Sequence, residues 1–564
     1  MSKFPRMKPH SMSPAPLHHL AAADHTAADA AALHTIGCGA APAALPTPEW
    51  VGSKAYNLMR MAALGLPVPP AFVLDTHWCA RPEELTAAIW QPALHALERA
   101  SGLRFGDARH PLLLSVRSGA PVSMPGMLET LLNIGLCDTT VPGLLRLTGN
   151  PRLVWDAYRR LVAGYGEIVS GIAAQAFSAD LQAVAASRDE RELDFAELRD
   201  ITHRHLATHA RESGQPFPQD PVDQLGAAIH AVFSSWHADK ARTYRRIKGL
   251  DDAMGTAVTV QRMVFGNAGG VSGAGVGFTR NPSSGEPSPW VDFLFNAQGE
   301  DVVSGRRSAR GHEAMAAVAP AVWRLLVDVA RRLETEFRDM QDFEFTVEQG
   351  QLFLLQTRDG KRTPQAAARI ALDLLDRGLI SPDEALRRTQ GLDHHALELT
   401  TLLAPDGALP PPLARADSAS SGVAVGVIAL DEMSARTQHA AGRAVLLLRQ
   451  DAETSDLAAL DHAVGLLTQR GARTSHAAVV ARQLGKVCLV GCDVLHIDVS
   501  HRTVILGGQT FGEGDMLTLD GNSGSVYAGA LQVSRQVPPD LLARLAALRG
   551  HPVAAQGQSG GRKA

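Results

Sequence analysis

The chain has 564 residues, of which 45% are hydrophobic and 20% are charged, and its formal net charge is −4. This length allows several domains with ample core, and the balanced charge predicts neither a nucleic-acid partner nor a membrane surface. No apolar run approaches the ~20 residues that span a bilayer, and the five cysteines form no disulfide framework, so we expect a cytoplasmic protein.

The N-terminal region is rich in Ala, His and Pro, and we expect residues 1–45 to be a disordered tail. Gly52 and Ser53 then precede a helix that we expect from Lys54 to Leu64. In its first turn the helix dipole disfavours the Lys54 cation by roughly 0.3–1 kcal/mol. A bound polyphosphate would explain this lysine, and an exposed side chain with a screened penalty explains it equally well.

A second basic residue ends a buried strand. The apolar run 112–116 predicts this strand, and Arg117 follows it next to Ser118 and Gly119. Such a position points a guanidinium either into a cleft or into a salt bridge between domains. From about 140 to 250 the apolar spacing is typical of helices.

Glycines are concentrated between the strand-like runs 258–265 and 276–279, which predicts a hairpin with a glycine-rich tip. The segment ends neither in a P-loop Lys-Ser nor in a Rossmann fingerprint. A glycine-rich hairpin tip can present backbone N–H groups to phosphates, and a merely flexible loop would have the same composition. Gly273 and Gly275 are the candidate residues here.

An alternating segment near residue 342 predicts a strand with Asp342 and Glu344 on one face, about 7 Å apart. A second strand, 352–355, leads to Gln356 and Arg358, which again share a face. Carboxylates and an amide can hold Mg²⁺ with a nucleotide's phosphates, and an arginine can neutralise the transferred group. Periodicity alone favours a solvent-facing hairpin.

The breaker-rich segment 403–413 predicts a linker, and a compact α/β unit follows from about 415 to 530. Within this unit a buried strand, 464–467, ends before Gly471, and Thr474 and Ser475 are candidate N-caps for a helix over 477–484.

His476 therefore lies in the first turn of that helix, where unpaired N–H groups and the dipole favour an anion attached to the ring. Arg470 and Arg473 add positive charge nearby. The position suits a histidine that carries a phosphoryl group. An ordinary surface or core histidine is the alternative, since the chain has 22 histidines.

These segments resemble, in order, the motifs of the pyruvate phosphate dikinase family. The similar segments are 51–58, 65–70, 114–135, 263–267, 278–282, 296–301 and 468–486. The Ser-Met-Pro-Gly-Met run at 123–127 is closer to that family than to phosphoenolpyruvate synthases. The resemblance covers about residues 48 to 532.

The resemblance implies an α/β and α+β multidomain fold. It has an ATP-grasp domain over 46–360 with a helical insert at about 135–215, a helical linker and hinge over 361–414, a swivelling phosphohistidine domain over 415–532, and a tail over 533–564.

The resemblance also implies roles for the candidate residues. Lys54 and Arg117 would contact phosphates, and Asp342 and Glu344 would hold Mg²⁺. Gln356 and Arg358 would complete the wall of the ATP site, and Gly273 and Gly275 would belong to its glycine-rich loop. His476 would receive the β-phosphoryl group of ATP while inorganic phosphate receives the γ-phosphoryl group, which leaves AMP and pyrophosphate.

Three places depart from the family pattern. Gly-Gly-Lys-Gly is replaced by residues 52–55, Gly-Ser-Lys-Ala. Ser-Gly-Thr-Gly is replaced by 272–275, where Ala274 removes a hydroxyl that could contact the γ-phosphate. Gly-Gly-Met-Thr-Ser-His is replaced by 471–476, with Ala472 and Arg473 in place of Gly and Met.

In the family, pyruvate and phosphoenolpyruvate bind a C-terminal (β/α)₈ barrel, which needs about 250 residues. Only 34 residues follow position 530. We therefore expect a partial-reaction enzyme that passes its phosphoryl group to a separate barrel protein. An unrelated acceptor and a non-catalytic nucleotide-binding regulatory subunit are the alternatives, and a homodimer stays open.

Overall fold

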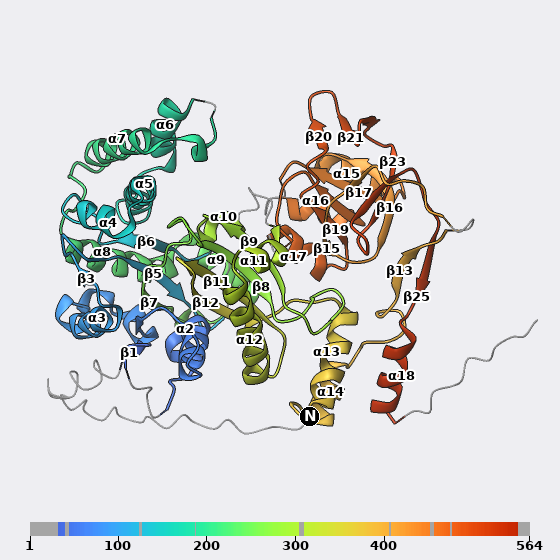
Figure 1. Ribbon diagram of the computed structural model, residues 1–564, viewed down its shortest axis with the longest axis horizontal. Helices are drawn as coiled ribbons and strands as arrows, with labels where there is room; N and C mark the ends of the chain where they lie inside the picture. Colours follow the sequence, from blue (N-terminus) through green and yellow to red (C-terminus); the bar gives the residue numbers. More distant parts are fainter. Residues whose placement is uncertain are drawn as a thin grey trace, which may run out of the picture.

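The computed structural model describes residues 32–39, 44–122, 124, 127–186, 188–303, 310–404, 408–451, 456–473 and 476–550. The described chain is a mixed α/β protein built around several separate sheets, so the broad fold class expected from the sequence is confirmed (Figure 1). No described helix is long and apolar enough to cross a membrane.

The first sheet is antiparallel and is covered by helices that lie next to it in the chain. Its strands, in spatial order, are β1 (Leu33–Ile36), β2 (Ala71–Leu74), β7 (Ala257–Arg262), β5 (Leu114–Gly119) and β6 (Thr130–Ile134). Helices α2 (Pro48–Ala63) and α3 (Ala87–Ser101) pack on it. β1 corrects the expected disordered tail of residues 1–45 for Leu33–Ile36 only, because Ile36 is buried in the core beside α2, and residues 1–31 lie outside the described chain.

The second sheet is also antiparallel. Its strands are β10 (Arg310–Gly311), β9 (Trp290–Phe295), β8 (Gly273–Phe278), β11 (Gln341–Glu348) and β12 (Gln351–Asp359). Helices α10 (Gly299–Val303), α11 (His312–Val318) and α12 (Pro320–Phe337) accompany it. The apolar side of α12 is buried with Phe343 and Phe345 of β11.

The hairpin expected between residues 258 and 279 is wrong, because β7 and β8 belong to different sheets. Gly273 and Gly275 lie inside β8, not at a loop tip. A Cβ at Gly273 would overlap the ring of Phe293, and one at Gly275 would overlap the ring of Phe345. These glycines make room for aromatic rings, a packing requirement that the sequence pattern alone does not distinguish from a loop.

Helices between residues 141 and 248 connect strands β6 and β7 of the first sheet, and those between 141 and 213 fall in the segment expected as a helical insert. They are α4 (Val141–Thr148), α5 (Pro151–Ile168), α6 (Ala174–Ala185), α7 (Phe195–Ser213), α8 (Pro221–Ser234) and α9 (Asp239–Lys248). Asp194 and Glu197 form a capping box at the start of α7. Figure 1 shows α5, α6 and α7 extending away from the sheets at one end of the molecule.

The C-terminal part is a separate α/β unit around a mixed sheet. In spatial order its strands are β14 (Ala414–Arg415), β24 (Ser525–Ala528), β23 (Met516–Asp520), β16 (Val423–Ala429), β17 (Val445–Arg449), β18 (Gly465–Thr468), β19 (Val487–Val490) and β15 (Asp417–Ser420). Strands β16 to β19 run parallel. Helices α15 (Glu432–Ala440), α16 (Leu457–His462) and α17 (His476–Gln483) belong to this unit, as does a small sheet of β20 (Leu495–Asp498), β21 (Thr503–Leu506) and β22 (Gln509–Gly512).

Two chain segments connect this unit to the rest of the molecule. Helices α13 (Pro364–Asp376) and α14 (Pro382–Arg388) lead to β13 (Leu399–Leu402), which pairs with the returning strand β25 (Val533–Gln536) (Figure 1). Helix α18 (Pro539–Leu548) then packs on α13 through Leu541 and Leu545. The expected C-terminal tail is therefore wrong for residues 533–548, because their apolar side is buried against an element far away in sequence.

Short elements complete the described chain. They are β3 (Arg104–Phe105), β4 (Pro111–Leu112) and the 3₁₀ turns at Thr76–Ala80, Pro82–Glu84, Glu190–Glu192, Ser235–His237 and Asp252–Met254.

Candidate active site

A close approach of α2 to β5 brings two basic residues together. Gly52 interrupts α2 with a φ of 75°, and a Cβ there would overlap the carbonyl oxygen of Gly119. Both the backbone N–H and the hydroxyl of Ser53 donate to the carbonyl of Ala120, at 3.2 and 3.3 Å. The helix resumes directly afterwards, so Lys54 lies near the end of β5 and the Arg117 side chain.

The β11–β12 hairpin supplies the acidic residues. Its register sets Asp342 opposite Arg358 and Glu344 opposite Gln356, so these four residues are brought together as the alternation predicts. The Arg358 Nε donates to Asp342 Oδ2 at 2.8 Å. Across the gap between the two sheets, Arg117 Nη2 lies 3.9 Å from Glu344 Oε2. The face is therefore not the plain solvent-facing hairpin that periodicity alone favours.

The electrostatics of this group are unbalanced. The pKa of Lys54 is lowered to about 7, chiefly by burial and also by the nearby Arg117 and Arg358, while Glu344 opposes the shift. Burial raises the pKa of Asp342, and the Arg358 guanidinium opposes that rise. Three basic side chains thus share two carboxylates, one of which is hydrogen-bonded to an arginine. A bound polyanion would supply the missing negative charge.

These residues also fit a magnesium ion held together with phosphates. Asp342 and Glu344 are oxygen ligands on one face of β11, and Mg²⁺ in phosphotransfer sites takes one or two carboxylates plus substrate oxygens. Among the described residues no group of three or more His, Cys, Asp or Glu side chains is placed to hold a metal alone. A nucleotide would therefore have to provide the remaining ligands.

A cavity of about 340 Å³ lies beside this group, between the two sheets. Its lining includes Arg117, Glu344, Asn133, Gln261 and Arg262. The Oδ1 atom of Asn133 and the Nε atom of Arg262 are buried and have no hydrogen-bond partner within the described part of the chain. Buried polar atoms of this kind are normally paired, so their position at a cavity wall indicates a polar ligand.

Sequence reasoning missed Asn133, Gln261 and Arg262. A polar residue inside an otherwise apolar strand was the signal that could have found the first two. Their common cavity depends on how the strands of the two sheets face each other, which no local pattern contains.

Gly273 and Gly275 do not join this group as loop residues. Strand β8 is paired with β9 on one side and β11 on the other, so its backbone N–H groups belong to the sheet ladders. Groups that are already paired cannot cradle a phosphate as a hairpin tip does. Ala274, between them, points to the opposite face and packs with Ala472 of the C-terminal unit.

His476 is the first residue of α17, one position earlier than the expected helix start. Thr474 and Ser475, the expected N-caps, lie outside the described residues. The segment that carries His476 lies against the second sheet, because Ala472 packs with residues of β8 and β9, and Arg473 binds Asp292 of β9. Arg470 is directed elsewhere and lies 3.6 Å from Asp451.

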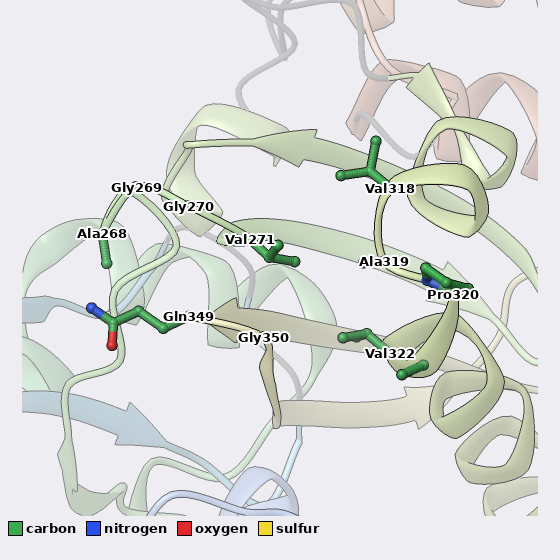
Figure 2. Close-up of a pocket in the computed structure, with 11 residues that line it drawn as sticks. Ala268, Gly269, Gly270, Val271, Val318, Ala319, Pro320, Val322, Gln349 and Gly350 are labelled. Carbon is green, nitrogen blue, oxygen red and sulfur yellow. The ribbon is translucent and has the colours of Figure 1, made fainter.

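A second cavity, of about 560 Å³, contains none of the predicted residues (Figure 2). Figure 2 shows the backbone of Gly269 and Gly270 facing Val318 and Pro320 across it. No charged side chain lines it within the described residues. It is therefore a poor site for a polyphosphate.

Comparison with known proteins agrees with this arrangement of two units. The family model for the pyruvate phosphate dikinase AMP/ATP-binding domain matches residues 81–313 and 313–378. The model for the mobile domain of PEP-utilising enzymes matches residues 442–524.

Three curated relatives illustrate the extent of the similarity. The chain is 41% identical over 501 residues to pyruvate, phosphate dikinase of Clostridium symbiosum, a match that covers 86% of this chain and 56% of that protein. It is 40% identical over 528 residues to the Rhizobium meliloti (strain 1021) protein of the same name, covering 88% and 58%. It is 39% identical over 503 residues to pyruvate, phosphate dikinase 2 of Zea mays, covering 87% and 56%.

The AMP/ATP-binding domain model alone covers more than half of the chain, and the chain therefore belongs to the pyruvate phosphate dikinase family. It spans about half the length of the curated relatives that it matches.

Proposed function

We propose that this chain carries an ATP-grasp nucleotide site and a phosphohistidine domain, and that it catalyses ATP-dependent phosphorylation of His476. The unbalanced group of Lys54, Arg117 and Arg358 with two carboxylates is the observation that carries this proposal. Its two carboxylates and Arg358 belong to the second sheet, against which the segment that carries His476 packs. The family of the chain supports the same conclusion.

In this proposal the polyphosphate of ATP binds Lys54, Arg117 and Arg358, and its negative charge restores the protonated state of Lys54. The base lies in the cavity lined by Gln261, and Gln356 completes the wall. Asp342 and Glu344 hold Mg²⁺, which supplies neutralisation of the phosphate charge when it is bound.

His476 acts as the nucleophile. Its position in the first turn of α17 would favour a negative phosphoryl group attached to the ring. A bond forms between an imidazole nitrogen and the β-phosphorus of ATP as the α–β phosphoanhydride bond breaks and AMP leaves. The β–γ bond then breaks as inorganic phosphate takes the γ-phosphoryl group. The products are phosphohistidine, AMP and pyrophosphate. The two connecting strands β13 and β25 would act as the hinge on which the phosphorylated domain moves.

For the onward step we propose a pyruvate-binding barrel as the acceptor. The relatives are named pyruvate, phosphate dikinases, and pyruvate is part of that name. The half-reaction at His476 does not depend on this step and can be tested without it.

The test uses ATP radiolabelled in its β-phosphate, with Mg²⁺ and inorganic phosphate. We expect acid-labile label on the peptide that contains His476, with AMP released in equal amount, and no label in His476→Asn. Absence of both label and AMP, with and without phosphate, would contradict the proposed function. Addition of pyruvate and a free-standing barrel protein should then remove the label, whereas label that stays on the protein would contradict the proposed acceptor.

A further inference from the structure

Arg473, three residues before His476, reaches from the C-terminal unit to strand β9 of the second sheet, which is called the nucleotide-binding sheet below. Its Nε and Nη2 atoms lie 2.8 and 2.7 Å from Asp292 Oδ1, and Nη2 also donates to the carbonyl of Val291 at 3.0 Å. Its guanidinium carbon lies 4.4 Å from the centre of the Trp290 ring. In this arrangement Asp292 is 0% exposed and the Arg473 side chain is 16% exposed.

A second arginine supports the first. Arg482 of α17 is 1% exposed and donates through Nη2 to the backbone carbonyl of Arg473 at 3.2 Å. It also donates to the carbonyl of Ala419 at 2.9 and 2.6 Å, which ties α17 to β15. Its guanidinium carbon lies 5.2 Å from the Trp290 ring centre. Trp290 therefore contacts two cations from the unit that carries His476.

Departures from the family pattern meet at this contact. Ala472 packs in one apolar cluster with Ala274, and these are positions where the family motifs have Gly and Thr. Arg473 stands where the motif has Met. Ala472 thus adds a methyl group where the family pattern has Gly, and Arg473 adds a charged partner for Asp292 where it has Met.

We propose that Arg473 is a positioning residue that holds the His476 segment on the nucleotide-binding sheet through Asp292 and Trp290. This inference rests on the proposed function, since docking matters only if His476 receives a phosphoryl group from ATP. In the docked arrangement the two charges are desolvated and paired, and in a swung-out arrangement both are hydrated. Because the contact with Asp292 forms only in the docked arrangement, loss of Arg473 should destabilise that arrangement and leave the swung-out one unaffected.

The consequence is a selective effect on docking. Truncation of one member of a buried charge pair between two surfaces weakens their association by about 30-fold or more. We expect Arg473→Met to reduce the single-turnover rate of His476 phosphorylation at saturating Mg-ATP by about this factor. The affinity for ATP should stay unchanged, because Arg473 lies outside the group around Lys54.

The experiment measures two properties of the full-length chain. Small-angle X-ray scattering reports the radius of gyration, which should rise in Arg473→Met and in Asp292→Asn as the units separate. Single-turnover labelling of His476 reports phosphorylation. In a double-mutant cycle the second substitution should change the scattering and the labelling rate little once the first is present, because the two residues act through one contact.

Arg443→Met is the matched control. Arg443 is an exposed arginine of the same unit, and its Nη1 donates to Gln438 of that unit at 3.0 Å. It should leave both scattering and labelling unchanged. Unchanged scattering and labelling in Arg473→Met, or fully additive effects in the cycle, would overturn the positioning role. If the unsubstituted protein is not labelled at all, the proposed function fails, while scattering still decides whether Arg473 holds the units together.

Discussion

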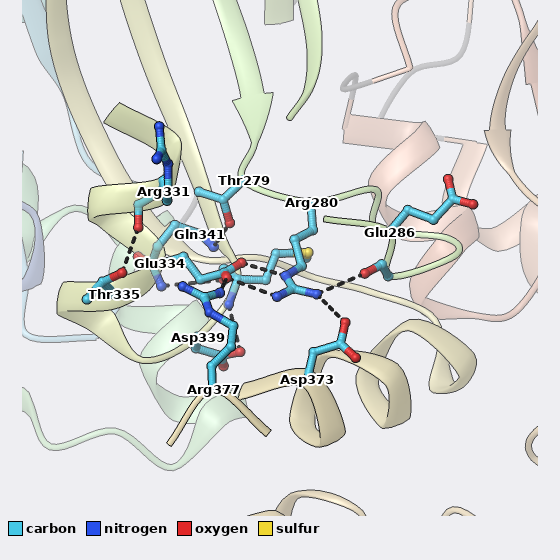
Figure 3. A network of polar contacts seen from close by, with 12 residues as sticks. Thr279, Arg280, Glu286, Arg331, Glu334, Thr335, Asp339, Gln341, Asp373 and Arg377 are labelled. Atoms are coloured by element: carbon cyan, nitrogen blue, oxygen red, sulfur yellow. Dashed lines mark hydrogen bonds and ion pairs between the residues drawn. The ribbon is translucent and has the colours of Figure 1, made fainter. Parts of the chain in front are cut away.

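Two groups of charged residues that border the second sheet differ in how their charges are compensated. At the end of β8, Arg280 is 1% exposed and binds Glu334 through Nε and Nη2, at 2.6 and 3.0 Å, and Asp373 through Nη1 at 2.7 Å (Figure 3). Arg377 also binds Glu334, and Arg544 of α18 binds Asp373 and Asp376 at 2.9 and 2.8 Å. This group has three cations and three carboxylates.

The group around Lys54 has three cations and two carboxylates, and Lys54 forms no ion pair with a carboxylate in the described part of the chain. The first group joins β8, α12, α13 and α18 into one body. The group around Lys54 has an excess of positive charge that a bound anion could neutralise. Charge balance, more than burial, therefore distinguishes a structural ion-pair group from a candidate binding site.

The largest expected effect comes from breaking the balanced group. Arg280→Leu leaves Glu334 and Asp373 without their main cation inside the protein, so the free energy of unfolding should fall by about 3–5 kcal/mol. Urea denaturation measures it. Arg331→Leu is the control: Arg331 and its partner Asp328 are both exposed on α12, and its loss should cost less than about 1 kcal/mol. Similar losses in the two variants would mean that the Arg280 group is not structural.

In the group around Lys54, removal of a cation should not destabilise the protein. Lys54→Met removes a cation that lacks a carboxylate partner, so the free energy of unfolding should stay the same or rise. ATP affinity should instead fall by about 1.5–3 kcal/mol, the usual contribution of a hydrogen bond to a charged group. Calorimetric titration with Mg-ATP measures the affinity. A destabilised variant with unchanged ATP affinity would place Lys54 among the structural residues.

A smaller change in stability is expected when the packing of β8 between β9 and β11 is disturbed. In Gly275→Ala the new methyl group would overlap the Phe345 ring, and we expect about 1–3 kcal/mol of destabilisation from overpacking. Gly226→Ala is the matched control, because its Cβ meets nothing within 4 Å and it lies inside helix α8. That variant should be stabilised by about 0.5–1 kcal/mol. A neutral Gly275→Ala would show that these glycines are not required by the aromatic packing.

The smallest effect is a change in proton binding. The folded protein holds the pKa of Lys54 at about 7, below the ordinary range of lysine, and a bound polyphosphate raises it again. ATP binding should therefore take up a proton above pH 7, and ATP affinity should weaken as pH rises from about 7 to 9. Calorimetry in buffers of different ionisation enthalpy measures the uptake. Lys54→Arg should show no proton uptake on ATP binding, because arginine keeps its proton. Equal uptake in both proteins would show that Lys54 is not the group that takes up the proton.

Local patterns were sufficient for several parts of the site. Alternation over 341–345 and the strand after Gly350 predict that Asp342, Glu344, Gln356 and Arg358 share a face, and the β11–β12 register confirms it. These contacts join residues close in sequence, so strand geometry alone decides them. The roles assigned to these residues remain proposals.

Contacts between residues far apart in the sequence could not be predicted from local patterns. The runs around β7 and β8 predict a hairpin, yet each strand finds its partners elsewhere, because burial of Phe343 and Phe345 decides which sheet β8 joins. The pairing of β13 with β25 joins residues more than a hundred positions apart.

The sequence by itself determined the kinds of chemistry available: a lysine at a helix start, arginines at strand ends, paired carboxylates on one strand face, and a histidine at a helix N-terminus. Only the tertiary structure decided which positive charge meets a carboxylate. Arg473 shows this most clearly, since it was expected to serve the phosphoryl group at His476 and instead binds Asp292. The reason is physical: charge compensation depends on distance and desolvation in three dimensions, and neither is contained in the spacing of residues along a chain.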